Sequence, residues 1–357
     1  MRIEQIKTVK LECRWGPPED NKTRMWPIHF VHTNTGHIGI SRGGSPELVR
    51  DVFAPLLSGE DPRRTARLWQ IMYDRAWSFK GPGRSAMTTI GALDVALWDL
   101  YGKSCGEPVW RLLGGHRNRV RAYADGIGYV HQGAKEVAGL VKKHADLGYR
   151  SVKFHLSNAD EALALEKVRL SREALGDDRE LMIDVHRMWD GVKAAEMARQ
   201  FDPYDLYWIE EPVRGDDEAA HLRMVREATR ALVAGGESEG TLYGVRHLIQ
   251  EGGLQVVQSD ILGGGGFTGL MRMAALAEAH HVYIAPHGAS YPEINAHFVA
   301  AVPNGLRVSA CPHTEPYQIW SDLYAPAFQI EGGEIALSDR PGLGLAFDAP
   351  FIEAHRI

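Results

Sequence analysis

Cysteine is scarce in this sequence. The three cysteines, Cys13, Cys105 and Cys311, are far apart, odd in number and without the paired spacing of a zinc site. A disulfide scaffold and a cysteine-ligated metal centre therefore do not fit this chain. We expect the three thiols to be reduced and buried.

Long hydrophobic runs and an excess of positive charge are also missing. No stretch of about eighteen apolar residues occurs, and "MRIEQIKTVKLECRW" at the start intersperses charges where a signal peptide would be continuously apolar. The formal net charge of −6 disfavours a nucleic-acid or anionic-membrane partner. These features predict a cytoplasmic protein, and an anionic substrate would have to be attracted by local positive charge.

The length of 357 residues predicts one large and one smaller domain. Alternating apolar residues in 3–11 and a Thr35–Gly36 turn within 28–41 predict an antiparallel meander. From residue 45 to 114 the pattern is helical: "SPELVRDVFAPLL" begins with a Ser–Pro N-cap, and the helix in "SAMTTIGALDVALWDLYGK" is expected to stop at Gly102. Gly114–Gly115 marks the predicted domain boundary.

Beyond this boundary, short apolar runs alternate with amphipathic helical stretches such as "AKEVAGLVKKHADLG". The apolar runs show little alternation, as expected for parallel strands that are covered on both faces. We predict strands near 119–124, 150–156, 181–186, 206–210, 231–235, 254–260, 281–286 and 306–311. Strands separated by helices in this way are typical of a (β/α) barrel, whose functional residues gather at the C-terminal ends of the strands.

Polar, reactive residues close these apolar runs, with main spacings of 23 to 31 residues. They are Lys153 and His155, Asp184 and His186, Glu210, Glu237, Asp260, His287 and Glu315. In a barrel they would all reach one rim around a shared pocket. A single polar residue at a strand end is commonplace because the chain re-enters solvent there, but recurrence in successive units favours a functional site.

Three consecutive units contribute carboxylates, namely Asp184, Glu210 and Glu237. Three negative charges that face one another raise each other's pKa, so a divalent cation is the natural neutraliser. Ligation by oxygen alone points to Mg²⁺ and not to zinc. The alternative, acids paired with lysines, needs more lysines than the preceding strand offers.

Asp260 and His287 end neighbouring units. A carboxylate beside an imidazole fixes its tautomer and raises its basicity, so we interpret His287 as a general base. Alone, "APHG" would be more typical of a buried structural histidine, and it is the acid one unit earlier that favours catalysis. Lys153 would contact a substrate carboxylate or act as a second acid or base.

The run "GGGGFTG" follows a strand and precedes a helix, and Gly264, Gly266 and Gly269 match the dinucleotide-binding pattern G-x-G-x-x-G. The acid expected at the end of the next strand is missing, since "VYIAPHG" has His287 there. We therefore predict a tight turn that lets the backbone pass close to the pocket, and no nucleotide site.

Over essentially its whole length the chain resembles the mandelate racemase subgroup of the enolase superfamily. The resemblance rests on "ALDVALWDL", "SVKFH", "MIDVH", "WIEEP", "AGGES", "SDILGGGG", "APHG" and "HTEP". It implies an α/β fold in which residues 116–320 form a modified TIM barrel, (β/α)7β. An α+β capping domain would comprise residues 1–115, with the C-terminal segment 321–357 returning to it.

The resemblance also implies a site. Mg²⁺ would be held by Asp184, Glu210 and Glu237, and the shared chemistry is abstraction of the proton next to a carboxylate to give an enediolate. The base would be His287 with Asp260. Glu315 would hydrogen-bond the substrate carboxylate.

Two positions bear on the type of reaction. The K-x-K usual on the second barrel strand is K-x-H here, so His155 replaces a lysine that often serves as the opposite-face base. A two-base racemase is therefore less well supported. His186, two positions after the first metal ligand, resembles the histidine that protonates the departing hydroxyl in galactonate and mannonate dehydratases of this subgroup.

The sequence thus predicts an Mg²⁺-dependent dehydratase that converts a sugar acid, either an aldonate or an aldarate, into a 2-keto-3-deoxy acid. His287 would remove the C2 proton and His186 would protonate the leaving 3-hydroxyl, while Lys153 contacts the carboxylate or a hydroxyl. His155 is predicted to bind substrate. The cap loop "RWGPPEDNKTRMWP" would close the pocket, although a merely solvated loop has the same composition. Its candidate contacts are Arg14, Lys22, Arg24 and Trp26.

Two alternatives stay open at this point. One is a racemase, epimerase or cycloisomerase that uses His287 opposite Lys153 or His155. The other is a non-catalytic protein of the same fold that binds a sugar acid or a metal. The resemblance also implies a homo-oligomer.

Overall fold

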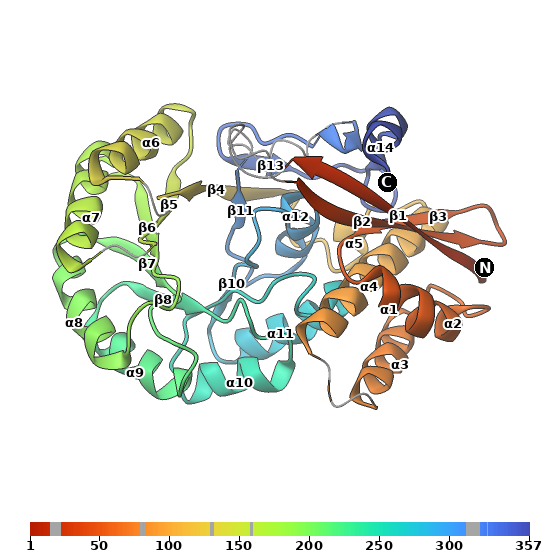
Figure 1. Cartoon of the computed structure of the whole chain (residues 1–357), viewed down its shortest axis with the longest axis horizontal. Helices are drawn as coiled ribbons and strands as arrows, with labels where there is room; N and C mark the ends of the chain where they lie inside the picture. Colours follow the sequence, from red (N-terminus) through yellow and green to blue (C-terminus); the bar gives the residue numbers. More distant parts are fainter. Residues whose placement is uncertain are drawn as a thin grey trace.

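The computed structural model describes residues 1–14, 23–78, 81, 83–128, 132–157, 160–311, 322–326 and 328–357, with Arg14 described by its backbone only. Figure 1 shows a barrel on the left and a sheet with helices, formed by the N-terminal part of the chain, on the right. The two are in contact along helix α4 (Arg84–Cys105), which packs against α11 (Gly266–Ala279).

The N-terminal sheet is an antiparallel meander, as predicted. Its strands are β1 (Ile3–Arg14), β2 (Thr23–Thr33) and β3 (Ile38–Arg42), in the order β1-β2-β3. The turn between β2 and β3 contains Gly36 at φ 81°, a left-handed backbone conformation that glycine adopts without a steric cost.

Helices follow the sheet. They are α1 (Pro46–Leu48), the π-helical turn Val49–Phe53, α2 (Ala54–Leu57), α3 (Thr65–Trp77), α4 and α5 (Val109–Leu112). The predicted N-cap is confirmed, since Ser45 accepts a hydrogen bond from the backbone N–H of Leu48 at 3.2 Å. The predicted end of α4 at Gly102 is wrong, because the helix continues to Cys105 and ends at Gly106 with φ 71°. Gly102 is instead a point of close packing, where a Cβ would lie 2.7 Å from Cα of Gly342.

Parallel strands form the barrel, which confirms the predicted (β/α)7β architecture. They are β4 (Arg119–Ile127), β5 (Ser151–His155), β6 (Glu180–Asp184), β7 (Leu206–Glu210), β8 (Leu232–Gly235), β9 (Val256–Val257), β10 (Tyr283–Ile284) and β11 (Val308–Ala310). Their order is β10-β9-β8-β7-β6-β5-β4-β11, and a parallel bridge between Ile284 and Gly305, just before β11, closes the ring.

Helices alternate with these strands and cover the outside of the barrel in Figure 1. They are α6 (Ala134–Asp146), α7 (Glu161–Leu175), α8 (Gly191–Phe201), α9 (Glu218–Ala228), α10 (Leu242–Gln250), α11 and α12 (Pro292–Ala301). Side chains from several strands, among them Tyr123, Met182 and Trp208, fill the interior. Because the strands are buried on both faces, their sequences show little alternation of polar and apolar residues.

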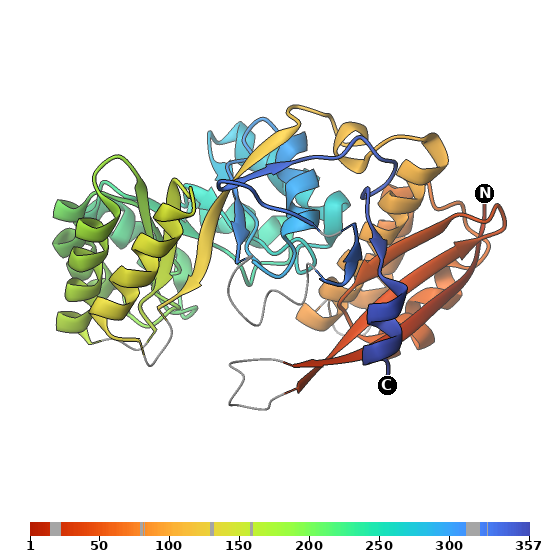
Figure 2. The same ribbon diagram turned by 90° about the horizontal axis from the view of Figure 1, so that it is seen from above.

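The C-terminal segment runs back toward the N-terminal sheet. It contains β12 (Tyr324–Ala325), β13 (Glu334–Ala336), β14 (Ala346–Phe347) and α14 (Ala349–His355). β13 pairs antiparallel with β4, and Arg356 bridges to Leu11 of β1. In Figure 2, α14 lies beside the strands of the N-terminal sheet. The exact domain boundaries stay a prediction.

The glycine run 263–266 lies where the cap meets the barrel. A Cβ on Gly266 would lie 2.5 Å from a carboxylate oxygen of Asp94 on α4. Asp94 accepts hydrogen bonds from the hydroxyl of Thr268 at 2.6 Å and from its backbone N–H at 2.9 Å. The predicted close approach of the backbone is therefore present, but the partner is helix α4 of the cap.

The three cysteines form no disulfide, and Cys13 and Cys311 are buried as predicted. Cys105 is exposed, so the prediction of three buried thiols is wrong for this residue. It lies in the last turn of α4, away from the buried face of that helix. Among the described residues, no helix has the length and apolar character needed to cross a membrane.

Candidate active site

The C-terminal ends of β5, β6 and β7 bring three predicted site residues into register. His155 is paired with Asp184, and Asp184 with Glu210. Both carboxylates are buried, with relative exposures of 0% and 1%. Buried acids require a nearby positive charge or hydrogen-bond donors.

Lys153 supplies the positive charge. Its Nζ lies 2.6 Å from Oε1 of Glu210, 3.3 Å from Oδ2 of Asp125 and 3.9 Å from Oδ2 of Asp184. Burial by itself lowers the pKa of Lys153, but the charges of Asp125 and Glu210 outweigh it and raise the pKa well above its ordinary value. The ammonium group therefore stays protonated among these carboxylates.

Asp125 was missed in the sequence. It lies in β4, 4% exposed, and its Oδ1 is 3.0 Å from Nε2 of His155, while Oδ2 accepts a hydrogen bond from Ser309 at 2.6 Å. Burial would raise the pKa of Asp125, yet Lys153 and His155 hold it far below its ordinary value. The signal was present, because Asp125 is the acid near the end of the first barrel strand.

His155 and His186 both contact the same oxygen of Asp184. Nδ1 of His155 is 3.1 Å and Nε2 of His186 is 3.2 Å from Oδ2 of Asp184, and the two rings stack with centroids 4.5 Å apart. Burial lowers the pKa of His155, but hydrogen bonds with Asp125 and Asp184 outweigh it and raise the pKa to about 9. His155 is thus held between two acids, whereas the side chain of His186 is 42% exposed.

The donor atoms at this rim fit a cation. Oδ2 of Asp184 is buried and accepts no well-aligned hydrogen bond from the described residues, while Oδ1 accepts one from the backbone N–H of His186 at 2.8 Å. Among the described residues, the potential ligands within 4.8 Å of one another are His155, Asp184 and His186. Glu210 and Glu237 are not part of this group. The carboxylates of Asp184, Glu210 and Glu237, predicted to bind the metal, are therefore not all within that distance of one another.

Glu210 is held in place by neutral donors. Its Oε2 accepts hydrogen bonds from Trp208 Nε1 at 3.1 Å and Gln258 Nε2 at 2.8 Å. Burial raises the pKa of Glu210, and the charge of Asp184 raises it further against the opposing effect of Lys153. A cation beside Glu210 would remove this cost of ionisation.

The predicted dyad of His287 and Asp260 is present as a contact. Nδ1 of His287 lies 2.8 Å from Oδ1 of Asp260, and its Nε2 lies 3.2 Å from Oε2 of Glu237. Burial lowers the pKa of His287, but Asp260 and Glu237 outweigh it and raise the pKa to about 10. Arg84, the first residue of α4, reaches the other oxygen of Asp260 with Nη2 at 3.0 Å, which links the cap to this pair.

The predicted cap-loop residues are only partly described. Arg24 is exposed on β2, and Trp26 is half-buried and packs against the main hydrophobic core. Lys22, Glu315 and the side chain of Arg14 lie outside the described residues. The roles assigned to these residues stay predictions.

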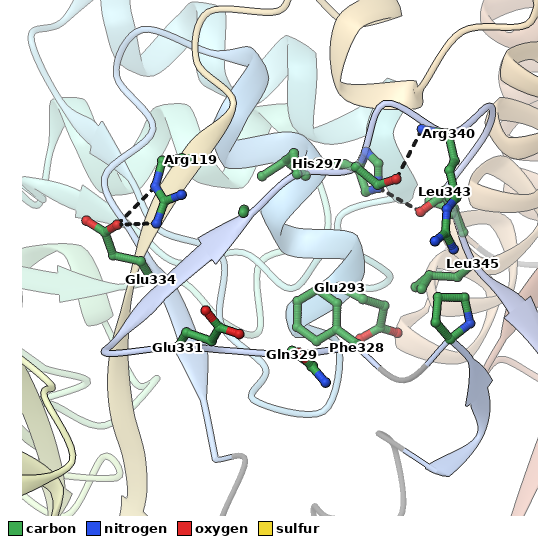
Figure 3. Close-up of a pocket in the computed structure, with 15 residues that line it drawn as sticks. Arg119, Glu293, His297, Phe328, Gln329, Glu331, Glu334, Arg340, Leu343 and Leu345 are labelled. Carbon is green, nitrogen blue, oxygen red and sulfur yellow. Dashed lines mark hydrogen bonds and ion pairs between the residues drawn. The ribbon is translucent and has the colours of Figure 1, made fainter.

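A separate hollow lies along the C-terminal segment, as Figure 3 shows. Its lining includes Glu293, His297, Phe328 and Arg340. None of the predicted site residues that the structure describes lines it. A smaller hollow, lined by Arg84, Glu237 and Thr241 among others, opens beside the dyad. We place the site at the barrel rim because the buried charges are concentrated there.

A barrel under an α+β cap, with acids, imidazoles and a buried lysine at the C-terminal ends of its strands, is the architecture of a TIM-barrel enzyme. Comparison with protein families makes this specific. The model "Enolase C-terminal domain-like" matches residues 136–351, and the model for the mandelate racemase / muconate lactonizing enzyme N-terminal domain matches residues 31–114. The chain belongs to the mandelate racemase/muconate lactonizing enzyme family of the enolase superfamily, as its motifs predicted.

Individual relatives include enzymes of two types. The chain is 34% identical over 296 residues to 3,6-anhydro-alpha-L-galactonate cycloisomerase of Streptomyces coelicolor, a match that covers 82% of this chain and 78% of the relative. It is 30% identical to the D-galactonate dehydratase family member ManD of Chromohalobacter salexigens, covering 82% and 80%. The crystal structure of a mandelate racemase/muconate lactonizing enzyme from a marine actinobacterium, in complex with magnesium, superposes with a TM-score of 0.90 at 27% identity over 100% of this chain and 99% of that chain.

Proposed function

We propose that this enzyme is a Mg²⁺-dependent dehydratase of a sugar acid, either an aldonate or an aldarate. One observation carries the proposal: His186 and His287 follow strands β6 and β10, which are four places apart in a ring of eight. The two imidazoles therefore face the pocket from opposite sides. Asp184, Glu210 and Glu237, from β6, β7 and the loop after β8, lie on the arc between them.

His287 is the proposed base for the proton at C2. Nδ1 of His287 is 2.8 Å from Oδ1 of Asp260. Nε2 is therefore the ring nitrogen that would accept the proton. In the described structure Nε2 points to Glu237, one of the proposed metal ligands. The proposed base is thus adjacent to the proposed metal site, as enediolate formation requires.

His186 is the proposed acid for the 3-hydroxyl. Its ring extends beyond Asp184 and is 42% exposed, so Nε2 can reach a substrate group. Protonation of the hydroxyl as it leaves would complete an elimination, giving an enol that tautomerises to the 2-keto-3-deoxy acid. Lys153 and His155 are poorer candidates for a second base, since Nζ of Lys153 lies 2.6 Å from Glu210 and both ring nitrogens of His155 face buried carboxylates, at 3.0 Å from Asp125 and 3.1 Å from Asp184.

Asp184, Glu210 and Glu237 are the proposed ligands of Mg²⁺, and the ion would supply positive charge to the developing enediolate oxygens. The carboxylate oxygens available as ligands, the burial of Asp184 and the raised pKa of Glu210 support this assignment. The magnesium complex of the marine actinobacterial structure supports it too. Lys153 would hold Glu210 in its orientation through the 2.6 Å contact.

The names of the relatives support a sugar acid as the substrate class. A second candidate reaction is cycloisomerisation, because the relative with 34% identity is a cycloisomerase. Both reactions begin with removal of the proton next to the carboxylate, so they share His287 and the metal ligands. They differ in the group that leaves or in the proton that is delivered at the neighbouring carbon, where His186 would act.

A panel of aldonates, aldarates and their lactone or anhydro forms, incubated with the enzyme and Mg²⁺, tests the proposal. We expect a 2-keto product from at least one aldonate or aldarate, detected as a carbonyl derivative and by NMR. Isomerised product that keeps all its hydroxyls would favour the cycloisomerase or epimerase assignment. Thermal stabilisation by a sugar acid without turnover or C2 proton exchange would favour a binding protein.

A further inference from the structure

Two charged residues directly follow proposed functional residues and contact each other. Arg187 comes after His186, and Glu211 comes after Glu210. Nε of Arg187 donates to Oε2 of Glu211, whose side chain is 2% exposed. The pair lies behind the rim, where the chain leaves β6 and β7.

The other oxygen of Glu211 reaches a third segment. Oε1 accepts hydrogen bonds from the backbone N–H of Gly236 at 2.8 Å and of Glu237 at 3.2 Å. These two amides belong to the loop after β8 that carries a proposed metal ligand. One buried carboxylate therefore joins the loop of His186 to the loop of Glu237.

The backbone around the pair is strained. His186, Arg187 and Glu211 have φ of 53°, 57° and 45°, in the left-handed region that non-glycine residues rarely adopt. Arg187 donates its backbone N–H to the carbonyl of Glu211 at 2.8 Å, which holds the two left-handed segments side by side. Such strain persists where surrounding contacts over-determine it, and it clusters at functional sites.

We infer that Glu211 and Arg187 are positioning residues that fix the loop of Glu237 relative to the loop of His186. Glu211 sets the direction of Glu237 through two amides, and Arg187 keeps the Glu211 carboxylate oriented. The inference rests on the proposed roles of Glu237 and His186. Neither Glu211 nor Arg187 needs to touch the substrate.

The chain offers a matched control at the other end of the barrel. Arg307 and Glu180 form an equally close ion pair, in which Arg307 is 2% exposed, but Glu180 is the first residue of β6 and lies away from the rim. In this pair the buried partner is the arginine, since the side chain of Glu180 is 31% exposed. Arg307→Met and Glu180→Gln therefore remove a partly buried ion pair without touching the loops at the site. Loss of stability alone would appear in these variants too.

The test compares Glu211→Gln and Arg187→Met with those controls. Mg²⁺ affinity is measured by calorimetry, and amide hydrogen exchange at Gly236 and Glu237 is measured in the metal-free protein. We expect Glu211→Gln to weaken Mg²⁺ binding by about 10- to 100-fold, the usual effect of losing a residue that orients a metal ligand, and to speed exchange at both amides. Arg187→Met should do the same to a smaller extent, and Arg187→Lys should recover part of the loss.

Equal Mg²⁺ affinities and equal exchange at both amides in Glu211→Gln and Glu180→Gln would overturn the inference. Should Glu211→Gln not fold, the same comparison between Arg187→Met and Arg307→Met decides the question. These readouts need no turnover. Failure of the wild-type enzyme to convert any sugar acid would refute the proposed function and leave the affinity comparison to decide the positioning role.

Discussion

Nε2 of His155 lies 3.0 Å from Oδ1 of Asp125, an acid of the first barrel strand whose other oxygen lies 3.3 Å from Nζ of Lys153. One carboxylate thus holds both members of the K-x-H pair. Since Lys153 and His155 also contact Asp184, Asp125 helps to arrange the proposed metal site from a strand that contributes no ligand to it.

Asp125→Asn should destabilise the protein strongly, because it leaves two buried cations short of a counter-charge. We expect the free energy of unfolding to fall by roughly 3 to 5 kcal/mol, the range for breaking one partner out of a buried ion pair. Ser309→Ala, which removes only the 2.6 Å hydrogen bond to Asp125, should cost about 1 kcal/mol. Urea denaturation of both variants measures the difference, and equal losses would contradict the charge argument.

His287→Asn should abolish exchange of the C2 proton with D₂O, because it removes the imidazole proposed to accept that proton. Asp260→Asn should lower exchange by roughly a hundredfold or more, within the range for disabling a general base. NMR of the substrate in D₂O measures both rates. Retention of near wild-type exchange in His287→Asn would mean that the base lies elsewhere on the rim.

His186→Asn separates the two proton transfers. We expect formation of the keto product to fall by roughly a hundredfold, while C2 exchange falls much less because His287 and Asp260 are untouched. The measurement is the ratio of the exchange and dehydration rates in the same sample. An equal decrease in both would show that His186 is required before or during enediolate formation and is not the acid for the leaving hydroxyl.

Removal of divalent cations should abolish turnover, and Mg²⁺ should restore it. Because a ligand that binds only the folded state stabilises it, Mg²⁺ at about a hundred times its Kd should raise the free energy of unfolding by about 2.7 kcal/mol. Glu210→Gln should remove most of this stabilisation at the same Mg²⁺ concentration. Identical melting curves with chelator and with Mg²⁺ would contradict a resident metal site.

Acid should destabilise the protein through His297, which lies in the hollow of Figure 3. Nδ1 accepts a hydrogen bond from the backbone N–H of Trp110, and Nε2 donates to the carbonyl of Leu343, both at 3.1 Å. Burial lowers the pKa to about 4, against an opposing effect of the Leu343 carbonyl. The neutral ring fits these partners, and the protonated ring would lose the bond with Trp110.

Because the folded-state pKa of His297 lies below its unfolded value of about 6.5, its contribution to stability is complete above that pH and is lost as the pH falls toward 4. The slope should reach at most about 1.4 kcal/mol per pH unit for this one proton. His297→Gln should be less stable at pH 7 but show a correspondingly flatter dependence between pH 7 and 4. Parallel curves for the two proteins would contradict the assignment.

Much of the barrel was predictable because buried parallel strands have a simple pattern. Strands such as 206–210 are short apolar runs that end in an acid, and helices of ordinary length separate them. Reactive residues recur at regular spacing at the ends of these runs, and this recurrence predicted that they meet at one rim of the barrel. Register pairs such as Asp184 with Glu210 confirm that these strand ends lie side by side.

Other features depend on contacts between distant segments. Asp125 lies near the end of the first barrel strand but was missed because "ADG" has the composition of a turn, and its contacts with Lys153, His155 and Ser309 show its importance. Gly102 was taken as a helix end, whereas its lack of a side chain serves the approach of Gly342, 240 positions later. The residues next to Asp125 and Gly102 in the sequence do not indicate which distant residues these two contact.

The return of the chain to its own beginning has a consequence for biosynthesis. The backbone N–H of Ile357 donates to the carbonyl of Lys10 at 3.1 Å, and Arg356 bridges to Leu11. Domains generally fold as they leave the ribosome, the N-terminal part first. Here the edge of β1 must wait, without these partners, until residues 356 and 357 have left the ribosome.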